Sequence, residues 1–332
     1  MSPHVTIGYH CSHEQIAPSL LLKHARRAAD AGFTAAMCSD HFHPWSERQG
    51  HSGFTWSWLG SALESTSLSF GTVCAPGQRY HPAVVAQGSA TLAEMCADRF
   101  WLAIGSGEAL NEAITGEPWP SKPDRNARLK ESADAIRRLW AGETVSMDGH
   151  ITVAAARLYV TPARTPLLLA AALSPATARW AASWADGLIT VAGSRTNMKA
   201  VVDAFREGGG ADKPMFLQVS LSYAPSNEEA VRCACEQWRH CALDSNALAD
   251  LSTPAEFDCA CAKADPADVL KKVRASADIS RHLDWLHEDC EFGYERIYLH
   301  NVARTYQDQF IDRCAEHILP AFTSVFAARS AL

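Results

Sequence analysis

Short hydrophobic runs alternate with amphipathic stretches along most of the chain. Runs rich in Val, Ile and Leu predict strands, and the stretches between them have helical spacing. The predicted strands are His4–His10, Ala35–Asp40, Leu68–Ala75, Phe100–Ser106, Pro166–Ala172, Gly187–Ala192, Met215–Tyr223 and Arg296–Asn301. The predicted helices are Pro18–Gly32, Phe54–Ser65, Pro82–Arg99, Arg125–Ala141, Pro175–Trp184, Asn197–Gly208, Asn227–Arg239 and Gln307–Phe322, with further helical segments up to Cys290.

This alternation indicates an α/β fold, a (β/α)8 TIM barrel. Parallel strands joined by right-handed helical crossovers close into a barrel when there are eight of them. A doubly wound open sheet is the competing architecture, but the even cadence favours closure. Two segments interrupt the pattern, a small hairpin excursion at Val145–Tyr159 and an irregular insertion at Cys241–Asp265 before the last strand. With no low-complexity linker, residues 1–332 are expected to form a single domain.

Composition narrows the functional classes. The 332 residues are 47% hydrophobic, which suffices for one large core, and the formal net charge is −7 without a basic block. Nucleic-acid binding is therefore not expected, since it needs clustered Lys and Arg. The N-terminus lacks the features of a secretory signal, and no window is long and apolar enough to span a membrane. Eleven cysteines, without Cys-x-x-Cys pairs, indicate reduced thiols and a cytoplasmic protein.

Candidate chemistry lies where predicted strands end, since active sites of such barrels sit at the carboxyl ends of the strands. Asp40-His41 follows the second strand and has the form of a proton-transfer group with an orienting carboxylate. The alternative is a capping Asp beside a surface His. Gly105-Ser106-Gly107-Glu108 follows the fourth strand and would present a carboxylate to a closely approaching ligand, although a plain turn is the simpler reading. Glu112 is interpreted as a solvated helix residue.

Several motifs together resemble the deazaflavin-dependent branch of the luciferase-like monooxygenase superfamily, which uses coenzyme F-420. The matching runs are Gly8-Tyr9 through Glu14-Gln15, Ser39-Asp40-His41-Phe42 with Pro44-Trp45, Arg79-Tyr80-His81-Pro82-Ala83-Val84 with Gln87, and Gly105 through Glu112. The likeness is dense to about Trp140 and thins after Leu158. Among the superfamily's members, the chain resembles the F-420-dependent glucose-6-phosphate dehydrogenases.

The resemblance implies a role for each matching residue. His41 would exchange a proton with the substrate, Glu108 would manage the proton at the cofactor ring, and Trp45 would pack beside the reacting centre. Glu14 and Lys272 would contact the substrate. The implied cofactor contacts are Asp40, Val73, Cys74, Ser106, Gly107, Asn111, Leu173, Ser174, Ala176 and Thr177. In the family, a bulge with a non-prolyl cis peptide lies where this chain has Val73-Cys74.

The chain also departs from the family's pattern. The family's dehydrogenases grip the sugar phosphate with a threonine and three basic residues, where this chain has Val191, Ser194, Leu248 and only one cation, Lys272. Without cationic donors, charge-assisted bonds to a phosphate are lost, so glucose 6-phosphate is not the expected substrate. The segment 71–79 is one residue shorter than in the family and lacks its threonine contact to the cofactor.

Other functions stay open on the sequence alone. FMN is the alternative cofactor, in a luciferase-like monooxygenase or a flavin-binding barrel without turnover, since the two ring systems have similar shapes. A metal-dependent barrel hydrolase is suggested by His41-x-His43 and His300, but further metal ligands at other strand ends are not found and no metal is expected. We expect a hydride-transferring oxidoreductase for a small organic substrate, and by resemblance a homodimer.

Overall fold

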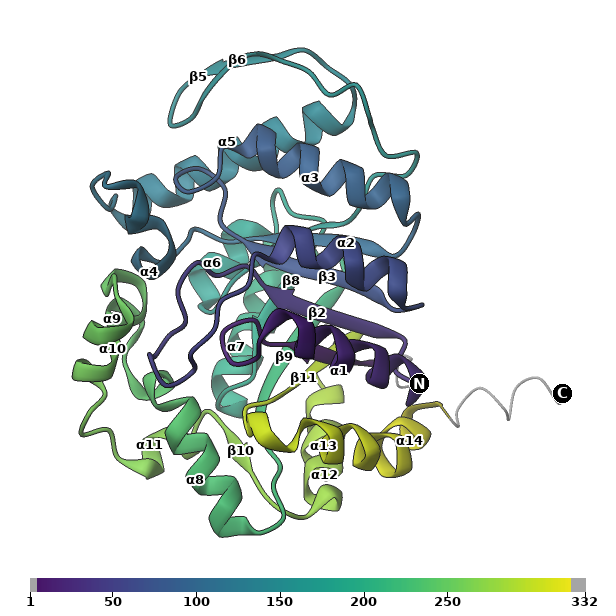
Figure 1. Ribbon diagram of the computed structural model, residues 1–332. Helices are drawn as coiled ribbons and strands as arrows, with labels where there is room; N and C mark the ends of the chain where they lie inside the picture. Colours follow the sequence, from purple (N-terminus) through teal and green to yellow (C-terminus); the bar gives the residue numbers. More distant parts are fainter. Residues whose placement is uncertain (1–4, 324–332) are drawn as a thin grey trace, which may run out of the picture.

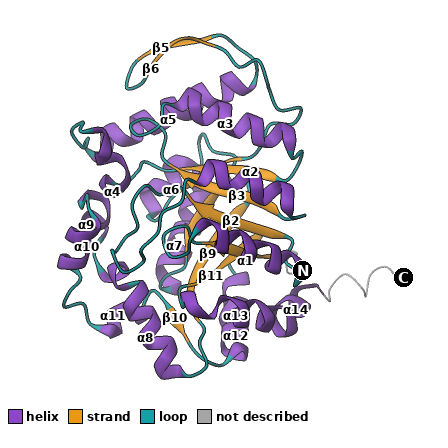
Figure 2. Cartoon of the chain, viewed as in Figure 1, coloured by secondary structure: helices purple, strands orange, loops and turns teal. Residues whose placement is uncertain are grey.

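The computed structural model describes residues 5–323 of the chain, in which strands lie at the centre and helices surround them (Figures 1 and 2). The strands are β1 Thr6–Cys11, β2 Ala35–Ser39, β3 Ser69–Cys74, β4 Phe100–Ile104, β5 Val145–Asp148, β6 Thr152–Ala156, β7 Leu168–Ala171, β8 Gly187–Val191, β9 Met215–Ser222, β10 Arg274–Ala275 and β11 Arg296–Asn301. The helices are α1 Pro18–Asp30, α2 Thr55–Ser65, α3 Pro82–Met95, α4 Ala109–Glu112, α5 Lys122–Trp140, α6 Pro175–Ala181, α7 Arg195–Phe205, α8 Asn227–Gln237, α9 Ser245–Asp250, α10 Pro254–Ala260, α11 Pro266–Leu270, α12 Ile279–Cys290, α13 Gln307–Arg313 and α14 Leu319–Thr323.

The sheet closes into a ring, which confirms the predicted barrel. Its order is β10-β9-β11-β1-β2-β3-β4-β7-β8, and β8 pairs in addition with β9. The barrel strands pair in parallel, and the two-residue β10 attaches to the end of β9 outside the ring. Each predicted barrel strand is present, with bounds that shift by a few residues. The prediction for the first strand began at His4, which lies outside the described residues.

The interior of the barrel is filled by aromatic side chains. Trp101, Phe216 and Tyr298 meet there, with ring centroids 5.2 Å apart for Trp101 and Phe216 and a 3.1 Å hydrogen bond from the Trp101 indole N–H to the Tyr298 hydroxyl. Neighbouring strands make room with small residues, because a Cβ on Gly71 would collide with Trp101 and one on Gly8 with Tyr298. These rings form a solid floor beneath the carboxyl ends of the strands.

The predicted hairpin excursion is correct: β5 and β6 pair in antiparallel fashion and lie beyond α5, apart from the barrel (Figure 1). The insertion predicted at Cys241–Asp265 is less irregular than expected, because it contains α9 and α10, while α11 follows it within the helical segments predicted up to Cys290. Each of these helices begins at a side chain that accepts a backbone hydrogen bond, Asp244, Thr253 or Asp265. Helices of six or seven residues are too short to show a helical period, so the pattern did not reveal α9 and α10.

Three further expectations concern the backbone and the cysteines. No peptide bond within residues 5–323 is cis, so the cis bond implied at Val73-Cys74 is not found. Both residues continue the regular pairing of β3 with β4, opposite Ala103 and Ile104, which leaves no bulge there. All eleven cysteines are free, as expected. None of the helices in the described part has the length and hydropathy needed to cross a membrane.

Candidate active site

The mouth of the barrel is lined by inward-facing residues at the carboxyl ends of most barrel strands. Alternation along each strand carries one residue in two toward the barrel axis, and deeper inward residues are buried. At the carboxyl ends the inward positions become part-exposed, and Val191 is 42% exposed. The residues concerned are Ser39, Val73, Gly105, Ala171, Val191, Gln218 and Ser220. The floor of this mouth is therefore apolar and its wall is made of small or neutral side chains.

His41 lies at the rim of this mouth, directly after β2, with its side chain only 10% exposed. Its Nε2 is 3.7 Å from a carboxylate oxygen of Glu14, and the other Glu14 oxygen accepts a 2.8 Å hydrogen bond from the Ser12 hydroxyl. Its Nδ1 is 3.3 Å from the amide nitrogen of Asn111. The Trp45 ring lies 5.2 Å from the imidazole, between centroids. Residues predicted as catalytic, substrate and cofactor contacts, which follow β1, β2 and β4, thus surround one imidazole.

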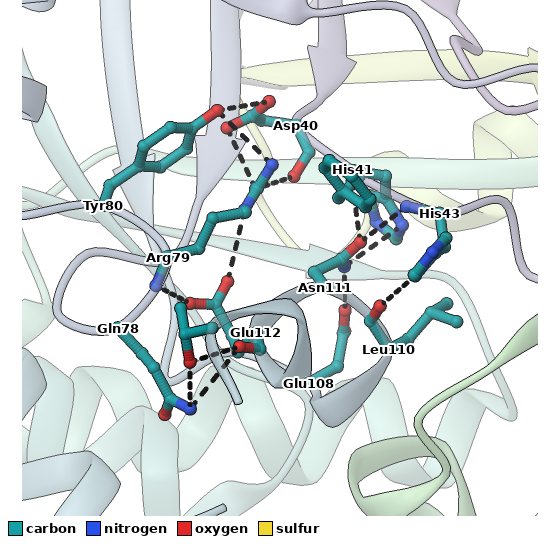
Figure 3. A network of polar contacts seen from close by, with 12 residues as sticks. Asp40, His41, His43, Gln78, Arg79, Tyr80, Glu108, Leu110, Asn111 and Glu112 are labelled. Atoms are coloured by element: carbon teal, nitrogen blue, oxygen red, sulfur yellow. Dashed lines mark hydrogen bonds and ion pairs between the residues drawn. The ribbon is translucent and has the colours of Figure 1, made fainter. Parts of the chain in front are cut away.

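Glu108 reaches the same place from the loop after β4. Its carboxylate accepts a 3.3 Å hydrogen bond from the same Asn111 amide that faces His41 (Figure 3). Burial raises the pKa of the Glu108 carboxyl, while His41, Asn111 and Lys122 oppose the increase. A carboxyl with a raised pKa can hold a proton closer to neutral pH than an ordinary glutamate can, which suits an acid–base role.

Lys122 is a site residue that the sequence analysis missed. It is the first residue of α5, and its ammonium group donates a 2.8 Å hydrogen bond to the hydroxyl of Ser106, which is a predicted cofactor contact. The Lys122 charge also acts on the Glu108 carboxyl. Because the lysine is separated from the Gly-Ser-Gly-Glu loop by more than ten residues and carries no motif of its own, spacing gave no signal for it.

Asp40 does not orient His41, contrary to the interpretation of the Asp-His pair. Consecutive residues of an extended chain point to opposite sides, and the Asp40 carboxylate is buried on the far side from the imidazole. It accepts hydrogen bonds from Arg79 at 3.2 Å and from the Tyr80 hydroxyl at 3.4 Å, and the Asp40 carbonyl oxygen accepts another from Arg79 at 2.8 Å. The carboxylate that faces His41 is Glu14.

Glu112 is also placed differently from the expectation, because it is buried rather than solvated. It accepts a 2.7 Å hydrogen bond from the backbone N–H of Arg79 and lies 3.6 Å from the Arg79 guanidinium. Arg79 therefore joins two buried carboxylates, and its side chain is 7% exposed. This Asp40–Arg79–Glu112 cluster holds the end of β2 against α4 and so fixes the two loops that carry His41 and Glu108 (Figure 3).

Further buried histidines lie near His41 and Trp45. The His10 and His300 rings are tilted against each other with their centroids 4.4 Å apart, and Trp45 stacks on His240 at 4.9 Å. Burial lowers the pKa of His240 and of His300 to about 3, so both rings are uncharged near neutral pH. No group of three or more His, Cys, Asp or Glu side chains within residues 5–323 is arranged to hold a metal ion.

The segment α9–α10 borders the mouth and is tied to two of its loops. Asp258 of α10 accepts hydrogen bonds from Ser46 at 2.6 Å and from Arg48 at 2.7 Å, in the loop that follows His41. Asp250 of α9 accepts one from the Trp119 indole at 3.1 Å. The insertion thus connects the loops after β2 and β4 above the barrel.

The structure does not bring every predicted residue to the site. Cys74 points outward into the core between strands and helices, so only its backbone can face the mouth. Lys272 is exposed at the end of α11, where its charge acts on the thiol of Cys241. Ser174 caps α6 by accepting from the Thr177 N–H at 3.3 Å, and Leu173 is 58% exposed beside it. The predicted ligand contacts of Leu173, Ser174, Ala176 and Thr177 stay predictions.

Comparison with known proteins decides the family. The family model for luciferase-like monooxygenases matches residues 5–288. The chain belongs to the luciferase-like monooxygenase family. An F-420-dependent glucose-6-phosphate dehydrogenase of Beutenbergia cavernae is 35% identical over 326 residues, which is 95% of this chain and 96% of the relative. A relative of the same name from Mycobacterium tuberculosis is 32% identical, covering 89% of this chain and 91% of its own.

Solved structures of known proteins share the fold. An F-420-dependent secondary alcohol dehydrogenase, in complex with an F-420–acetone adduct, superposes with a TM-score of 0.89 at 29% identity, over 97% of this chain and 99% of that one. A monooxygenase from Streptomyces bottropensis shares the fold, with a TM-score of 0.73 at 19% identity over 96% and 100% of the two chains. The chain is thus an oxidoreductase of this family, and the relatives' names support the predicted coenzyme F-420.

The mouth fits a planar ring of this kind. Val73 and Ala171 offer an apolar surface above the aromatic floor, and Gly105 and Gly107 keep the neighbouring backbone free of side chains. Gly107 has a φ of +81°, where a side chain would be strained and would approach Ala75 and Glu112. His41 and Glu108 follow β2 and β4, the strands on either side of β3, which carries Val73.

Proposed function

We propose that this protein is an F-420-dependent dehydrogenase that oxidises a small, uncharged alcohol, or reduces the corresponding carbonyl compound. The observation that carries the proposal is the convergence of His41, Glu14 and Glu108 at an apolar mouth that fits a planar ring. When bound there, a deazaflavin supplies a hydride acceptor and donor. Such chemistry needs one proton handled at the substrate oxygen and another at the ring, which matches two separate acid–base groups.

The chain's own residues divide this work. His41 and Glu14 face each other at 3.7 Å and take up the proton that leaves the substrate hydroxyl. Glu108, whose carboxyl pKa is raised by burial, holds the proton needed at the ring edge. Trp45 packs beside His41 and, with Phe257 at 5.2 Å between ring centroids, keeps water from that side of the imidazole. Positioned acid–base groups of this kind contribute about 10²–10⁴-fold to a rate.

The charges around the mouth favour an uncharged substrate. Arg79 is committed to Asp40 and Glu112, and Arg48 is committed to Asp258. Val191 contributes an apolar side chain to the wall, and the Ser194 hydroxyl is used as the cap of α7. A phosphate ester would find few free donors here, so its recognition would lack the charge-assisted bonds that it requires.

Glucose 6-phosphate is the second candidate substrate, because the 35%-identical relative is named for it. Lys122 favours this candidate, since its ammonium group has a hydroxyl partner rather than a carboxylate partner. An FMN-dependent monooxygenase is the alternative cofactor assignment, in keeping with the fold shared with a monooxygenase.

One experiment separates these candidates. The purified protein is mixed with oxidised F-420 and, in turn, 2-propanol, 2-butanol, ethanol and glucose 6-phosphate, and the loss of deazaflavin fluorescence is followed. We expect turnover with the secondary alcohols, little with glucose 6-phosphate, and a rate at least about 10²-fold lower in a His41→Ala variant that still binds F-420. Turnover with glucose 6-phosphate alone, or an FMN that binds while F-420 does not, would refute the proposal.

We also propose that the protein forms a homodimer through α2 and α3. Large apolar side chains are exposed there, with Phe54 before α2 and with Val84 and Met95 on α3. Light scattering during size-exclusion chromatography tests this directly, and a monomer at micromolar concentration would contradict it.

A further inference from the structure

Asn111 touches both of the proposed acid–base groups. It lies on α4, is buried, and its side chain reaches between His41 and Glu108 (Figure 3). Its amide nitrogen is 3.3 Å from His41 Nδ1 and 3.3 Å from a Glu108 carboxylate oxygen. One carboxamide therefore supplies both of its N–H groups to the site.

The orientation of this carboxamide is fixed by the backbone. The Asn111 Oδ1 accepts hydrogen bonds from the N–H groups of Phe42 at 2.9 Å and His43 at 3.4 Å. A backbone N–H can only donate, so the atom that faces these two groups must be the oxygen. The –NH2 end consequently faces His41, and a flipped amide would set two donors against two donors. The loop is held further because His43 Nδ1 lies 2.8 Å from the Leu110 carbonyl oxygen.

A hydrogen-bond donor that faces one ring nitrogen determines the tautomer of a neutral imidazole. In a neutral histidine one nitrogen carries the hydrogen and the other accepts. His41 Nδ1 faces the Asn111 N–H, so it must be the accepting nitrogen, and the hydrogen then resides on Nε2. Nε2 is the nitrogen that faces the Glu14 carboxylate, which is an acceptor when ionised. Both neighbours thus select the same tautomer.

We propose that Asn111 is a positioning residue that holds neutral His41 in the Nε2–H tautomer. This inference rests on the proposed function, which places His41 at the substrate oxygen. It goes further by assigning which of the two partners donates the hydrogen bond in that contact. The Nε2–H then donates to the substrate oxygen, and it is available to do so because the Glu14 carboxylate, at 3.7 Å, is beyond hydrogen-bond distance. Within the His41–Glu14 pair, the carboxylate is then the member left to accept the hydroxyl proton.

The test exchanges one atom of the side chain. Asn111→Asp keeps the shape and the oxygen that Phe42 and His43 need, but it replaces the donor that faces His41 by an acceptor. Protein labelled with ¹⁵N-histidine is examined at about pH 8.5, two units above the ordinary histidine pKa of about 6.5, by long-range ¹H–¹⁵N correlation, which distinguishes the two tautomers. A His41→Gln variant identifies the His41 signals by their disappearance.

We expect the wild-type His41 signals to show a hydrogen on Nε2 and none on Nδ1, and the Asn111→Asp signals to show one on Nδ1. Turnover of Asn111→Asp should fall by about 10²–10⁴-fold, the range seen when an acid–base histidine is lost or held in the wrong tautomer. Asn111→Ala should fall by less than Asn111→Asp, because it removes the donor without reversing it.

A hydrogen on Nδ1 in the wild-type protein, or an unchanged Nε2–H form in Asn111→Asp, would overturn the inference. The spectra do not depend on turnover, so this outcome is separable from failure of the proposed function. If the wild-type protein has the expected tautomer but oxidises no alcohol with F-420, the proposed function fails while the assignment of Asn111 stands.

Discussion

Replacing Arg79 by methionine should destabilise the protein more than any exposed ion pair can. The Arg79 side chain is 7% exposed and lies between the carboxylates of Asp40 and Glu112, which are 0% and 1% exposed. Arg79→Met leaves both carboxylates buried without a cation. Breaking a buried pair in this way costs about 3–5 kcal/mol of unfolding free energy, whereas exposed pairs contribute about 0–1 kcal/mol.

Urea denaturation followed by tryptophan fluorescence measures the difference. Arg138→Met is the matched control, since Arg138 forms an exposed pair with Glu143 at 2.9 Å. The triple variant Arg79→Met/Asp40→Asn/Glu112→Gln, which has no buried charge in the cluster, should regain part of the lost stability. Equal and small losses for Arg79→Met and Arg138→Met would refute the assignment of the cluster as the support of the two catalytic loops.

The pH dependence of this loss has a definite sign. Burial raises the pKa of the Asp40 and Glu112 carboxyls, and Arg79 opposes both increases. When a carboxyl has a higher pKa in the folded protein than in the unfolded chain, stability falls as the pH rises from the unfolded-state pKa to the folded-state pKa. Arg79→Met raises the folded-state pKa of both carboxyls further. The loss of unfolding free energy in this variant should therefore be small near about pH 4 and should grow toward neutral pH.

Three other variants probe the mouth itself. Ala171→Trp fills the apolar surface of the mouth and should abolish F-420 binding in a fluorescence titration without unfolding the protein. The control Ala156→Trp, on β6 and away from the barrel, should bind F-420 normally. Binding of F-420 to both variants would place the cofactor elsewhere. Glu108→Gln should lower the rate of alcohol oxidation by about 10²-fold or more. It should also remove the alkaline limb of the kcat/KM profile, because the protonated Glu108 carboxyl is lost as the pH rises through its raised pKa. A profile that keeps this limb would assign the limb to another group. Asp258→Ala frees α10 from Ser46 and Arg48, so amide hydrogen exchange over residues 245–260 should accelerate. The control Asp268→Ala removes an exposed ion pair with Lys271 and should leave this exchange unchanged. Equal exchange rates in both variants would show that the Asp258 bonds do not hold the segment.

The barrel was predictable because its signal is repeated. Each strand is a run of apolar residues ended by Gly, Pro or a polar cluster, and each long helix shows its own period, so the eight units confirm one another. The α9 and α10 helices escaped prediction because six or seven residues provide too few turns for a period to emerge. Their caps, such as the Thr253–Glu256 capping box, were the available signal.

The candidate site was predictable only in part. The motifs named His41, Glu108, Asn111 and Trp45, and the structure brings these four together. What the sequence did not contain is the direction of each side chain. The adjacency of Asp40 and His41 suggested a pair, but neighbours in an extended segment point apart.

Long-range contacts were likewise beyond the sequence. The true carboxylate neighbour of His41 comes from Glu14, at the end of another strand, and the partner of Glu112 is Arg79, 33 positions earlier. A buried Glu and a solvated Glu look alike until the residues that cover them are known. Lys122 reaches Ser106 across 16 positions for the same reason.

The position of a bound cofactor tests the central claim most directly. A crystal structure of the protein soaked with oxidised F-420 should show the deazaflavin ring against Val73 and Ala171, with His41 and Glu108 both facing the space at its reacting edge. A ring bound anywhere else, for example in the outer groove between α5 and α6 lined by Asn126, Lys130 and Trp180, would contradict the account.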